Sequence, residues 1–355
     1  MSVIQVKSRI RDYTVHLTED ARFVSGFEQL PHRRYVVDDN VWRLYRTSIL
    51  APLDPSLVIV QPISEELKTF GSVEALYDQL AELPAKRNLT VISIGGGILQ
   101  DITGFAASTL YRGVNWVCVP TTLLAQADSC IGGKTSLNYG RYKNLVGTFY
   151  PPSEVFIYTP FLATLEQQDF YSGLGEVVKY HIVGGPNSIR SLLNLLPAIG
   201  RRGNEALTAI VTNSLKVKLA YISEDEFDQG RRMLLNFGHD FGHALETTSD
   251  FLIPHGQAVL VGVILANIAS RNRGLLSRPF EMELRRMLLE PNIVVWPGRV
   301  HLEPDAVIDA MKRDKKREGD GLALVVLKDG YETQHLHDFT PDEARAVLEE
   351  FMGTY

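Results

Sequence analysis

Three histidines in the second half of the chain have the chemistry and spacing of metal ligands. His239 and His243 are four residues apart in the segment NFGHDFGHALE, so a helix would place both rings on one face. His255 follows between a proline and a glycine. A bare HxxxH pair is more often two hydrogen-bonded core histidines than a metal site. The third histidine makes a metal the better interpretation.

Glu176 could complete this set, because it lies in the segment GLGEVVK with Lys179 one helical turn later. Two histidines and one carboxylate, with one position left open, are typical of a catalytic zinc site. A zinc protease would need the pattern HExxH, whose glutamate is the base. This chain has Asp240 at that position and Gly242 before the second histidine, which disfavours a protease.

Gly95, Gly96 and Gly97 follow an expected strand and precede an expected helix. Backbone N–H groups in such a turn can approach a pyrophosphate closely. The pattern is not GxGxxG, and a tight strand-to-helix turn explains the three glycines about equally well. Polar residues that follow neighbouring strands favour a dinucleotide, because open α/β sheets bind ligands at this edge. These residues are Asp38, Glu65, Lys68, Thr121 and Thr122.

Several lysines and arginines lie beside glycines or within apolar stretches, as an anionic substrate would require. Each one alone is most often a solvated surface charge, and the sequence does not show that they converge. The set comprises Arg112, Lys134, Lys143, Lys179, Lys218, Arg232, Lys315 and Lys316.

The composition of the chain argues against several classes of protein. Among 355 residues, 42 acidic groups exceed 36 basic ones, and no basic block stands out, which argues against a nucleic-acid partner. Two cysteines are too few for a disulfide framework. The N-terminal segment lacks the apolar run of a secretory signal, and the longest apolar stretch, 258–269, is shorter than a membrane span. We expect a cytoplasmic protein with no membrane partner.

The expected secondary structure that positions these residues changes near residue 160, from alternating strands and helices to mostly helices. The first half alternates β-branched runs with amphipathic segments, which indicates parallel βαβ units. We therefore expect an α/β fold, with a Rossmann-like NAD-binding domain over residues 1–160 and a mostly α-helical metal- and substrate-binding domain over 161–355. The expected strands are 35–37, 57–60, 90–94, 114–119, 155–158 and 322–327; the expected helices are 72–83, 98–110, 173–182, 204–221, 232–247, 257–272 and 341–352.

A series of motifs in constant order between about residues 35 and 327 resembles the 3-dehydroquinate synthase family of sugar phosphate cyclases. The resemblance covers nearly the whole chain. Its motifs are GGGILQDITGFAA from Gly95, YRG around Arg112, PTTLLAQADSCIGGKT from Pro120, KNLVG from Lys143, GLGEVVK around Glu176, LLNFGHDFGHALE around His239, and the HG pair at His255.

The resemblance implies a reaction without net redox change. Bound NAD oxidises one substrate hydroxyl, phosphate is eliminated, the carbonyl is reduced again, and the opened enol closes by an intramolecular aldol step. The implied substrate is 3-deoxy-D-arabino-heptulosonate 7-phosphate, a phosphorylated sugar acid, and the products are 3-dehydroquinate and phosphate.

The resemblance also implies residue roles. Glu176, His239 and His255 would hold Zn²⁺ or Co²⁺, with His243 on the substrate side. Lys218 and Arg232 would bind the substrate carboxylate. The phosphate would be bound by Lys134, Asn144, Asn236, His243 and one of Lys315 or Lys316. Arg112 would reach the phosphate site of a neighbouring subunit, since the family is commonly dimeric.

The remaining implied roles concern the cofactor and polar partners. Asp38 would bind the adenosine ribose, and Asp128 and Lys179 would be polar partners in the active site, where Asp228 stands in place of a usual glutamate. The other NAD-binding positions would be Glu65, Lys68, Asp101, Thr121, Thr122, Lys134, Lys143 and the segment from Phe161 to Thr164.

Further departures from the family pattern are Ser64 in the segment before Glu65, Cys130 at a usual serine, and Asp240 and Gln257 near the metal ligands. They remove no metal ligand and no anion-binding residue. Whether they or Asp228 change the substrate stays open here.

Several other functions also stay open. A cyclase that acts on glucose 6-phosphate, such as a 2-deoxy-scyllo-inosose synthase, binds no carboxylate and would not need Arg232. Sedoheptulose 7-phosphate cyclases typically lack the NxGHxxGH pattern. A homologue of secondary metabolism that makes an amino analogue of dehydroquinate is harder to exclude, because its substrate also carries a carboxylate and a phosphate. A metal-dependent polyol dehydrogenase would release NADH, and a non-catalytic sensor would have lost a ligand.

Overall fold

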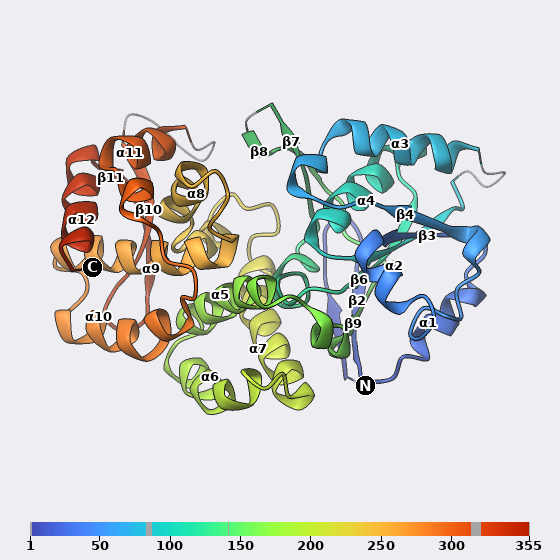
Figure 1. Ribbon diagram of the computed structural model, residues 1–355, viewed down its shortest axis with the longest axis horizontal. Helices are drawn as coiled ribbons and strands as arrows, with labels where there is room; N and C mark the ends of the chain where they lie inside the picture. The colour runs from blue at the N-terminus through green and yellow to red at the C-terminus, as the bar shows by residue number, and fades with distance from the viewer. Residues whose placement is uncertain (1, 83–86, 141, 314–320, 355) are drawn as a thin grey trace. The chain divides into compact units, whose positions relative to one another are not determined.

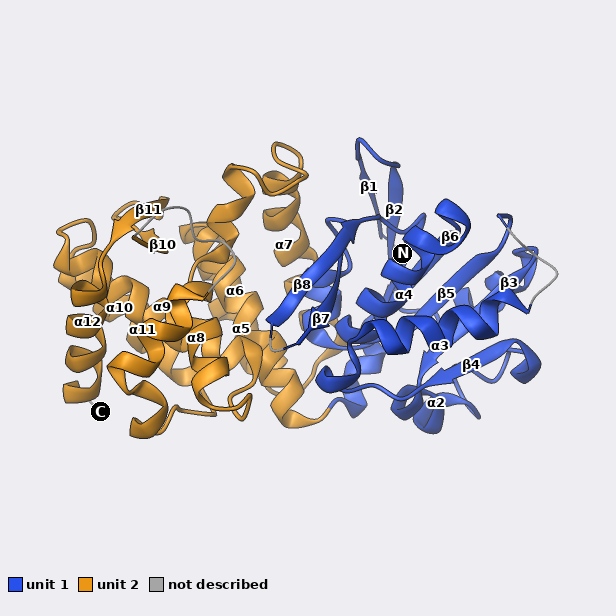
Figure 2. Cartoon of the chain, turned by 90° about the horizontal axis from the view of Figure 1, so that it is seen from above, with its two compact units in different colours: residues 1–165 blue, residues 166–355 orange. Residues whose placement is uncertain are grey.

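The computed structural model describes residues 2–82, 87–140, 142–313 and 321–354 (Figure 1). The chain forms two compact units, Met1–Leu165 and Glu166–Tyr355 (Figure 2). Residues 161–165 therefore belong to the first unit rather than to the helical one. The reason is packing: the Phe161 ring is buried edge-on against Tyr45 and Tyr158 of the first unit's core.

A seven-stranded sheet forms the centre of the first unit, in the order β1-β2-β9-β6-β5-β3-β4. All neighbouring strands from β2 to β4 run parallel, and β1 alone is antiparallel, at the edge. The strands are β1 (Ser2–Val6), β2 (Tyr13–Thr18), β3 (Arg33–Asp38), β4 (Val58–Gln61), β5 (Thr90–Gly95), β6 (Asn115–Pro120) and β9 (Glu154–Tyr158). The expected parallel strands of the first half are confirmed, whereas β1 and β2 were not predicted.

Helices cover both faces of this sheet. Tyr35, Ile92 and Val117 face a buried cluster that includes residues of α1 (Phe23–Gly26) and α2 (Asp39–Tyr45). On the opposite face α4 (Gly97–Thr109) packs on β5 and β6, and α3 (Phe70–Ala81) packs on α4. With both faces covered, β5 is buried at every position rather than at alternate ones. A separate hairpin of β7 (Lys134–Tyr139) and β8 (Tyr142–Phe149) packs against α4 and was not predicted.

The second unit is mostly helical. Its longest buried element is α9, which is buried at every position from 256 to 270, as expected of a helix that is apolar all round. A two-stranded sheet of β10 (Leu322–Leu327) and β11 (Thr333–Phe339) accompanies the helices. The helices of eight or more residues are α5 (Gln167–Val183), α6 (Pro186–Ile199), α7 (Asn204–Ile222), α8 (His239–Thr248), α9 (His255–Asn272), α11 (Pro304–Lys312) and α12 (Pro341–Thr354).

The single helix expected over residues 232–247 is wrong. A 3-10 segment, η7 (Arg231–Asn236), ends before Gly238, and α8 starts at His239. Gly238 has a φ of +79°, and a Cβ there would lie 2.7 Å from the backbone oxygen of Val259. The break follows from the close approach of α9, which only glycine permits.

The C-terminal helix α12 begins where its sequence predicts. Thr340 Oγ1 accepts a hydrogen bond from the backbone N–H of Glu343, and the Glu343 carboxylate accepts one from the Thr340 N–H. This reciprocal pair is a capping box, which satisfies two N–H groups at the helix start.

Within the described ranges, no helix is both long enough and apolar enough to span a bilayer.

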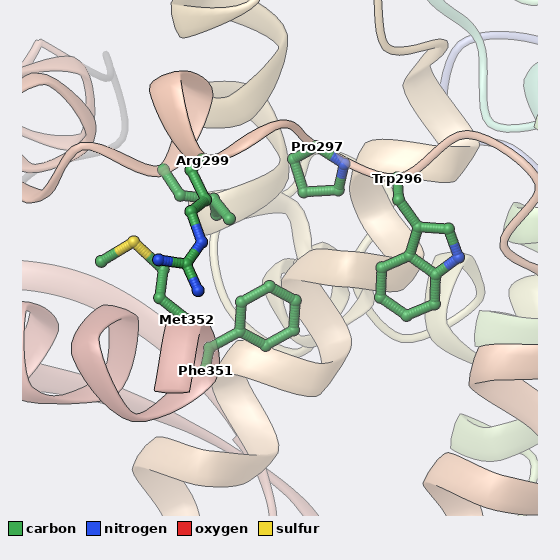
Figure 3. A pocket seen from close by; sticks show the side chains of 6 residues that line it. Trp296, Pro297, Arg299, Phe351 and Met352 are labelled. Atoms are coloured by element: carbon green, nitrogen blue, oxygen red, sulfur yellow. The ribbon is translucent and has the colours of Figure 1, made fainter. Parts of the chain in front are cut away.

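The second unit carries a mostly apolar pocket, in which the Trp296 and Phe351 rings are nearly parallel with centroids 6.5 Å apart (Figure 3). Its charged lining residue is Arg299. None of the predicted site residues lines it.

Candidate metal centre and nucleotide-binding edge

Three helices of the second unit bring Glu176, His239 and His255 together. Glu176 lies in the middle of α5, whereas His239 and His255 are the first residues of α8 and α9. The backbones of α5 and α9 touch beside these ligands: a Cβ at Gly175 would lie 2.1 Å from the carbonyl oxygen of Gly256. The glycines next to Glu176 and His255 are therefore required for the helices to approach.

The imidazoles converge on one carboxylate oxygen. Glu176 Oε1 lies 3.3 Å from His239 Nε2 and 3.2 Å from His255 Nε2. One potential ligand atom from each residue lies within 4.8 Å of the other two. The structure thus assembles the three residues that the resemblance implied as metal ligands.

The donor set fits a divalent cation. Glu176 is fully buried, and among the described residues neither of its carboxylate oxygens accepts a hydrogen bond, although Lys179 Nζ lies 2.7 Å from Oε2 as an ion pair. Buried polar oxygens without such bonds are costly. Two imidazole nitrogens and one carboxylate oxygen match the ligand preferences of Zn²⁺ and Co²⁺.

Neighbouring charges and burial shift the pKa values of the three ligand residues. Burial by itself would raise the pKa of Glu176, but Lys179, His239 and His255 hold that pKa well below its usual value. Burial, together with the Lys179 charge, lowers the pKa of His239 to about 3. Burial opposes protonation of His255 as well, but Glu246 and Glu176 raise its pKa to about 10.

Metal binding should therefore release one proton at neutral pH. Below about pH 10 the metal-free His255 ring carries two protons, and an ion at Nε2 displaces one of them; His239, with a pKa of about 3, is already neutral. The apparent affinity for Zn²⁺ should rise about tenfold per pH unit up to that value. Calorimetric titration in two buffers of different ionisation enthalpy measures the released proton.

The control is His337→Gln, which changes an exposed histidine of β11 and should leave the proton count unchanged. A wild-type affinity that does not vary between about pH 6 and pH 9 would contradict this assignment.

His243 lies beside the three converging residues. Its ring centroid is 5.3 Å from that of His239 and 5.9 Å from that of His255.

Lys179, the ion-pair partner of Glu176, also donates a hydrogen bond of 2.8 Å to the carbonyl of Leu235, near the end of η7. The buried Lys179 therefore links the metal centre to η7, the segment that carries Arg232.

The predicted carboxylate-binding pair occupies elements that pack together. Lys218 is buried on α7, and η7, which carries Arg232, packs against α7. Arg232 is 4% exposed and donates from Nη1 to the carbonyl of Glu226. Asn236 ends the same segment, and Asp228 lies in the preceding loop with a φ of +59°.

Asp225 organises this loop and was missed from the sequence. Its carboxylate accepts hydrogen bonds from the backbone N–H groups of Gln229, Gly230 and Arg232, at 3.0, 2.8 and 3.0 Å. Burial opposes ionisation, but these donors and the Arg232 charge lower the pKa of Asp225. The acidic run EDEFDQG was the available signal, because such residues commonly cap turns.

In the first unit, the expected nucleotide site lies where the strand order reverses. The chain passes from β3 outward to β4 and then returns to β5 on the other side of β3. At this edge a Cβ on Gly95 would meet the Cβ of Asp38 at 3.1 Å, and a Cβ on Gly96 would meet Thr122 Cγ2 at 3.0 Å. The Thr121 N–H bonds to the Gly95 carbonyl at 3.0 Å. Glycines and polar residues thus share the switch point at which doubly wound sheets bind ligands.

Asp38 has a structural role at this edge as well. Its Oδ1 accepts from the N–H groups of Asn40 and Val41 and so caps α2, while burial raises the pKa of the Asp38 carboxyl. Gly97 opens α4, whose N-terminal N–H groups begin at the same edge.

A polar network beside this edge links four elements. Lys68 Nζ lies 2.5 Å from Asp101 Oδ2 and 2.5 Å from Asn144 Oδ1. Ser136 donates from N and from Oγ to the Asp101 carboxylate, at 3.0 Å each. Asn144, implied as a phosphate ligand, therefore lies among expected cofactor residues of the first unit. Ser136 was not predicted.

Glu65 is tied to the hairpin in the same way. Asn138 Nδ2 donates to Glu65 Oε1 at 2.8 Å, and Lys143 Nζ lies 3.8 Å from that oxygen. Thr164, the last residue of the 3-10 segment η6 (Thr159–Thr164), is hydrogen-bonded to the Tyr45 hydroxyl at 2.6 Å.

Replacing Lys68 with methionine should destabilise the first unit. Lys68 is 5% exposed, so the change would leave the half-buried Asp101 carboxylate with its two Ser136 donors but without its cationic partner. Breaking such a pair costs about 2 kcal/mol once the partial exposure of Asp101 is considered. Urea unfolding measures the loss. Lys7→Met, in an exposed pair with Asp12, is the matched control and should have no measurable effect; equal stability of both variants would contradict the prediction.

The other predicted site residues lie in loops and hairpins of the first unit. Lys134 is the first residue of β7, Asp128 lies in a short π-helical turn (Ala125–Ser129), and Arg112 has a φ of +64° in the turn after α4. Lys315 and Lys316 lie outside the described residues.

Two departures from the family pattern have structural partners. The Asp240 carboxylate accepts a hydrogen bond of 3.0 Å from the backbone N–H of Val325 and so ties α8 to β10. The Gln257 amide donates to the carbonyls of Tyr171 and Asn292, and its oxygen accepts from the N–H of Val294. A glutamate at 257 could not donate to those carbonyls when ionised, so the amide suits this fold.

Comparison with known proteins identifies the family. A family model described as 3-dehydroquinate synthase N-terminal matches residues 58–172, and one described as 3-dehydroquinate synthase C-terminal matches residues 173–317. The chain belongs to the 3-dehydroquinate synthase family. A 3-dehydroquinate synthase of Dehalococcoides mccartyi strain CBDB1 is 35% identical over 329 residues, which are 91% of each chain.

Solved structures share the fold. A 2-epi-5-epi-valiolone synthase from Streptomyces hygroscopicus subsp. jinggangensis 5008, with NAD⁺ and Zn²⁺ bound, is 25% identical with a TM-score of 0.81 and 99% coverage of both chains. A 2-deoxy-scyllo-inosose synthase complexed with carbaglucose-6-phosphate, NAD⁺ and Co²⁺ is 21% identical with a TM-score of 0.81; the match covers 98% of this chain and 100% of that one. The expected fold class and the sugar phosphate cyclase function are confirmed.

Proposed function

We propose that the chain is an NAD- and metal-dependent carbon–oxygen lyase that converts 3-deoxy-D-arabino-heptulosonate 7-phosphate to 3-dehydroquinate and phosphate. The observation that carries this proposal is the convergence of Glu176, His239 and His255 in a chain of this family. The buried Arg232 supports a substrate with a carboxylate.

The two cofactors divide the chemistry. Residues at the β3–β5 edge such as Asp38, Gly96 and Thr122 would hold NAD, which would supply a reversible hydride acceptor, so that no net oxidation occurs. Glu176, His239 and His255 would hold a Zn²⁺ or Co²⁺ ion, which would supply a Lewis acid for the substrate hydroxyls. The transient carbonyl acidifies the neighbouring C–H bond, and loss of that proton expels phosphate.

The chain's own residues bind and orient the substrate. Lys218 and Arg232 hold the carboxylate, and His243, half-buried beside the ligand histidines, exchanges a proton on the substrate side. Lys179 keeps Glu176 ionised. The phosphate is bound by Lys134, Asn144, Asn236, His243 and one of Lys315 or Lys316.

We further propose a homodimer in which Arg112 reaches the phosphate site of the partner subunit, since its turn follows α4 at an accessible position. A cytoplasmic location agrees with two buried thiols, Cys118 and Cys130, which form no disulfide in the described part of the chain.

A cyclase acting on glucose 6-phosphate is the second candidate, because a 2-deoxy-scyllo-inosose synthase has the same fold. Such a substrate has no carboxylate to offer the buried guanidinium of Arg232. A substrate carboxylate would give this guanidinium a bidentate partner, which favours the heptulosonate.

The test is release of phosphate from 3-deoxy-D-arabino-heptulosonate 7-phosphate with NAD and Zn²⁺ or Co²⁺, with and without a chelator. We expect release that the chelator abolishes and no accumulation of NADH. Release only from glucose 6-phosphate or only from an amino analogue of the substrate would assign a related cyclase. Accumulation of NADH with a simple polyol would contradict the proposal in favour of a dehydrogenase.

A further inference from the structure

We propose that Glu246 is a positioning residue: it orients the metal ligand His255 through the ring nitrogen that faces away from the metal. The inference deepens the proposed function, because it rests on the metal site assigned there. Glu246 has no part in the ligand set, and nothing in the reaction described above uses it.

The two nitrogens of His255 contact two different carboxylates. Nε2 lies 3.2 Å from Glu176 Oε1, on the metal side, and Nδ1 lies 3.1 Å from Glu246 Oε2. A hydrogen bond at Nδ1 fixes the tautomer, leaves the lone pair on Nε2 and sets the angle of the ring. Glu246 therefore fixes the tautomer and the ring angle of His255, which a mobile or exposed side chain could not do.

Glu246 is itself held firmly. It is 5% exposed and lies near the end of α8, and its backbone carbonyl accepts hydrogen bonds from the N–H of Phe251 at 2.8 Å and from Ser249 Oγ at 3.2 Å. These bonds close the tight loop between α8 and α9, in which Asp250 and Phe251 have positive φ. Glu246 thus shapes the loop that precedes His255 through its backbone and contacts the His255 ring through its side chain.

A second cation bound by His243, Glu246 and His255 is the competing interpretation, because these three residues also offer ligand atoms within 4.8 Å of one another. Both groups of three share His255. When Nε2 binds an ion, the neutral ring keeps its proton on Nδ1, and a second ion could bind there only if that proton were removed. A hydrogen bond from Nδ1–H to the Glu246 carboxylate needs no loss of this proton. The structure therefore favours the positioning role of Glu246 over a second cation.

The test measures metal affinity directly. Glu246→Gln keeps the size and an acceptor oxygen but removes the charge, and Glu246→Ala removes the contact. Competition between each folded protein and a chromophoric chelator gives the Co²⁺ affinity, and the visible absorption of bound Co²⁺ reports the ligand geometry. We expect both variants to bind Co²⁺ about 10- to 100-fold more weakly, with the alanine variant the weaker of the two.

Asp250→Asn is the matched control. It removes a negative charge from the same loop, at an exposed residue whose left-handed backbone asparagine tolerates, and should leave the Co²⁺ affinity unchanged. An equal loss in this variant would mean that charge alone is responsible and would overturn the positioning role.

Two further results would overturn the proposal: wild-type Co²⁺ affinity and absorption in both Glu246 variants, or two Co²⁺ ions bound per wild-type chain. The proposed function fails on a different measurement. A wild-type protein that binds one Co²⁺ but releases no phosphate from the heptulosonate would refute the reaction and leave the role of Glu246 intact.

Discussion

Replacing Glu176 with glutamine should reduce chelator-sensitive phosphate release by about 10³-fold, because the site loses its only anionic ligand in the implied set. The carboxylate is fully buried between His239, His255 and Lys179, at distances of 3.3, 3.2 and 2.7 Å. Its neutral replacement offers one weak oxygen ligand and leaves the Lys179 charge uncompensated. Steady-state phosphate release and the Zn²⁺ content of the purified variant measure the two effects.

Glu281→Gln is the matched control for this variant. Glu281 is also a buried helical carboxylate in ion pairs, with Arg271 and Arg285, but it lies in α10 (Arg278–Leu284). It should lose stability while retaining stoichiometric metal. A Glu176→Gln protein that retains full metal and full turnover would refute the ligand assignment.

Replacing Arg232 with lysine should reduce kcat/KM for the heptulosonate by about 10²- to 10³-fold, mainly through KM. A guanidinium binds a carboxylate through two parallel hydrogen bonds, which an ammonium cannot reproduce. Arg232 is nine-tenths buried or more, so water cannot substitute for the lost donor. Initial rates over a range of substrate concentrations separate KM from kcat.

The neighbouring Arg231 provides the control. It is exposed, forms an ion pair with Glu224 at the surface, and should tolerate lysine with a change in rate of less than about threefold. Wild-type KM in the Arg232→Lys protein would remove the carboxylate-binding role and would favour a substrate without a carboxylate.

Much of the fold could be predicted because its signals are local. The strands β3, β5 and β6 contain clusters of β-branched and aromatic residues. The buried residues of α7 recur at helical spacing, and α12 has a capping signal. The hairpin β7–β8 was not predicted, because its strands are largely polar and partly exposed and their pairing depends on the partner strand rather than on composition.

The metal residues could be identified from types and order, but their geometry could not. His239 and His243 have the same spacing signal, and the sequence alone does not say which ring faces a carboxylate. The break at Gly238, caused by the approach of α9, makes His239 the first residue of α8 and directs its Nε2 to within 3.3 Å of Glu176. That contact joins residues more than 60 positions apart.

The sequence by itself determined the family, the two-part organisation and the residue types available for chemistry, because motifs and apolar periodicity are properties of short segments. Only the tertiary structure decided which of those residues meet. Asn144 joins Lys68 and Asp101, Gln257 satisfies four backbone groups, and Glu246 supports His255. Such contacts arise from the packing of distant helices and strands, which close-packed interiors fix to within a fraction of an ångström and which no local pattern encodes.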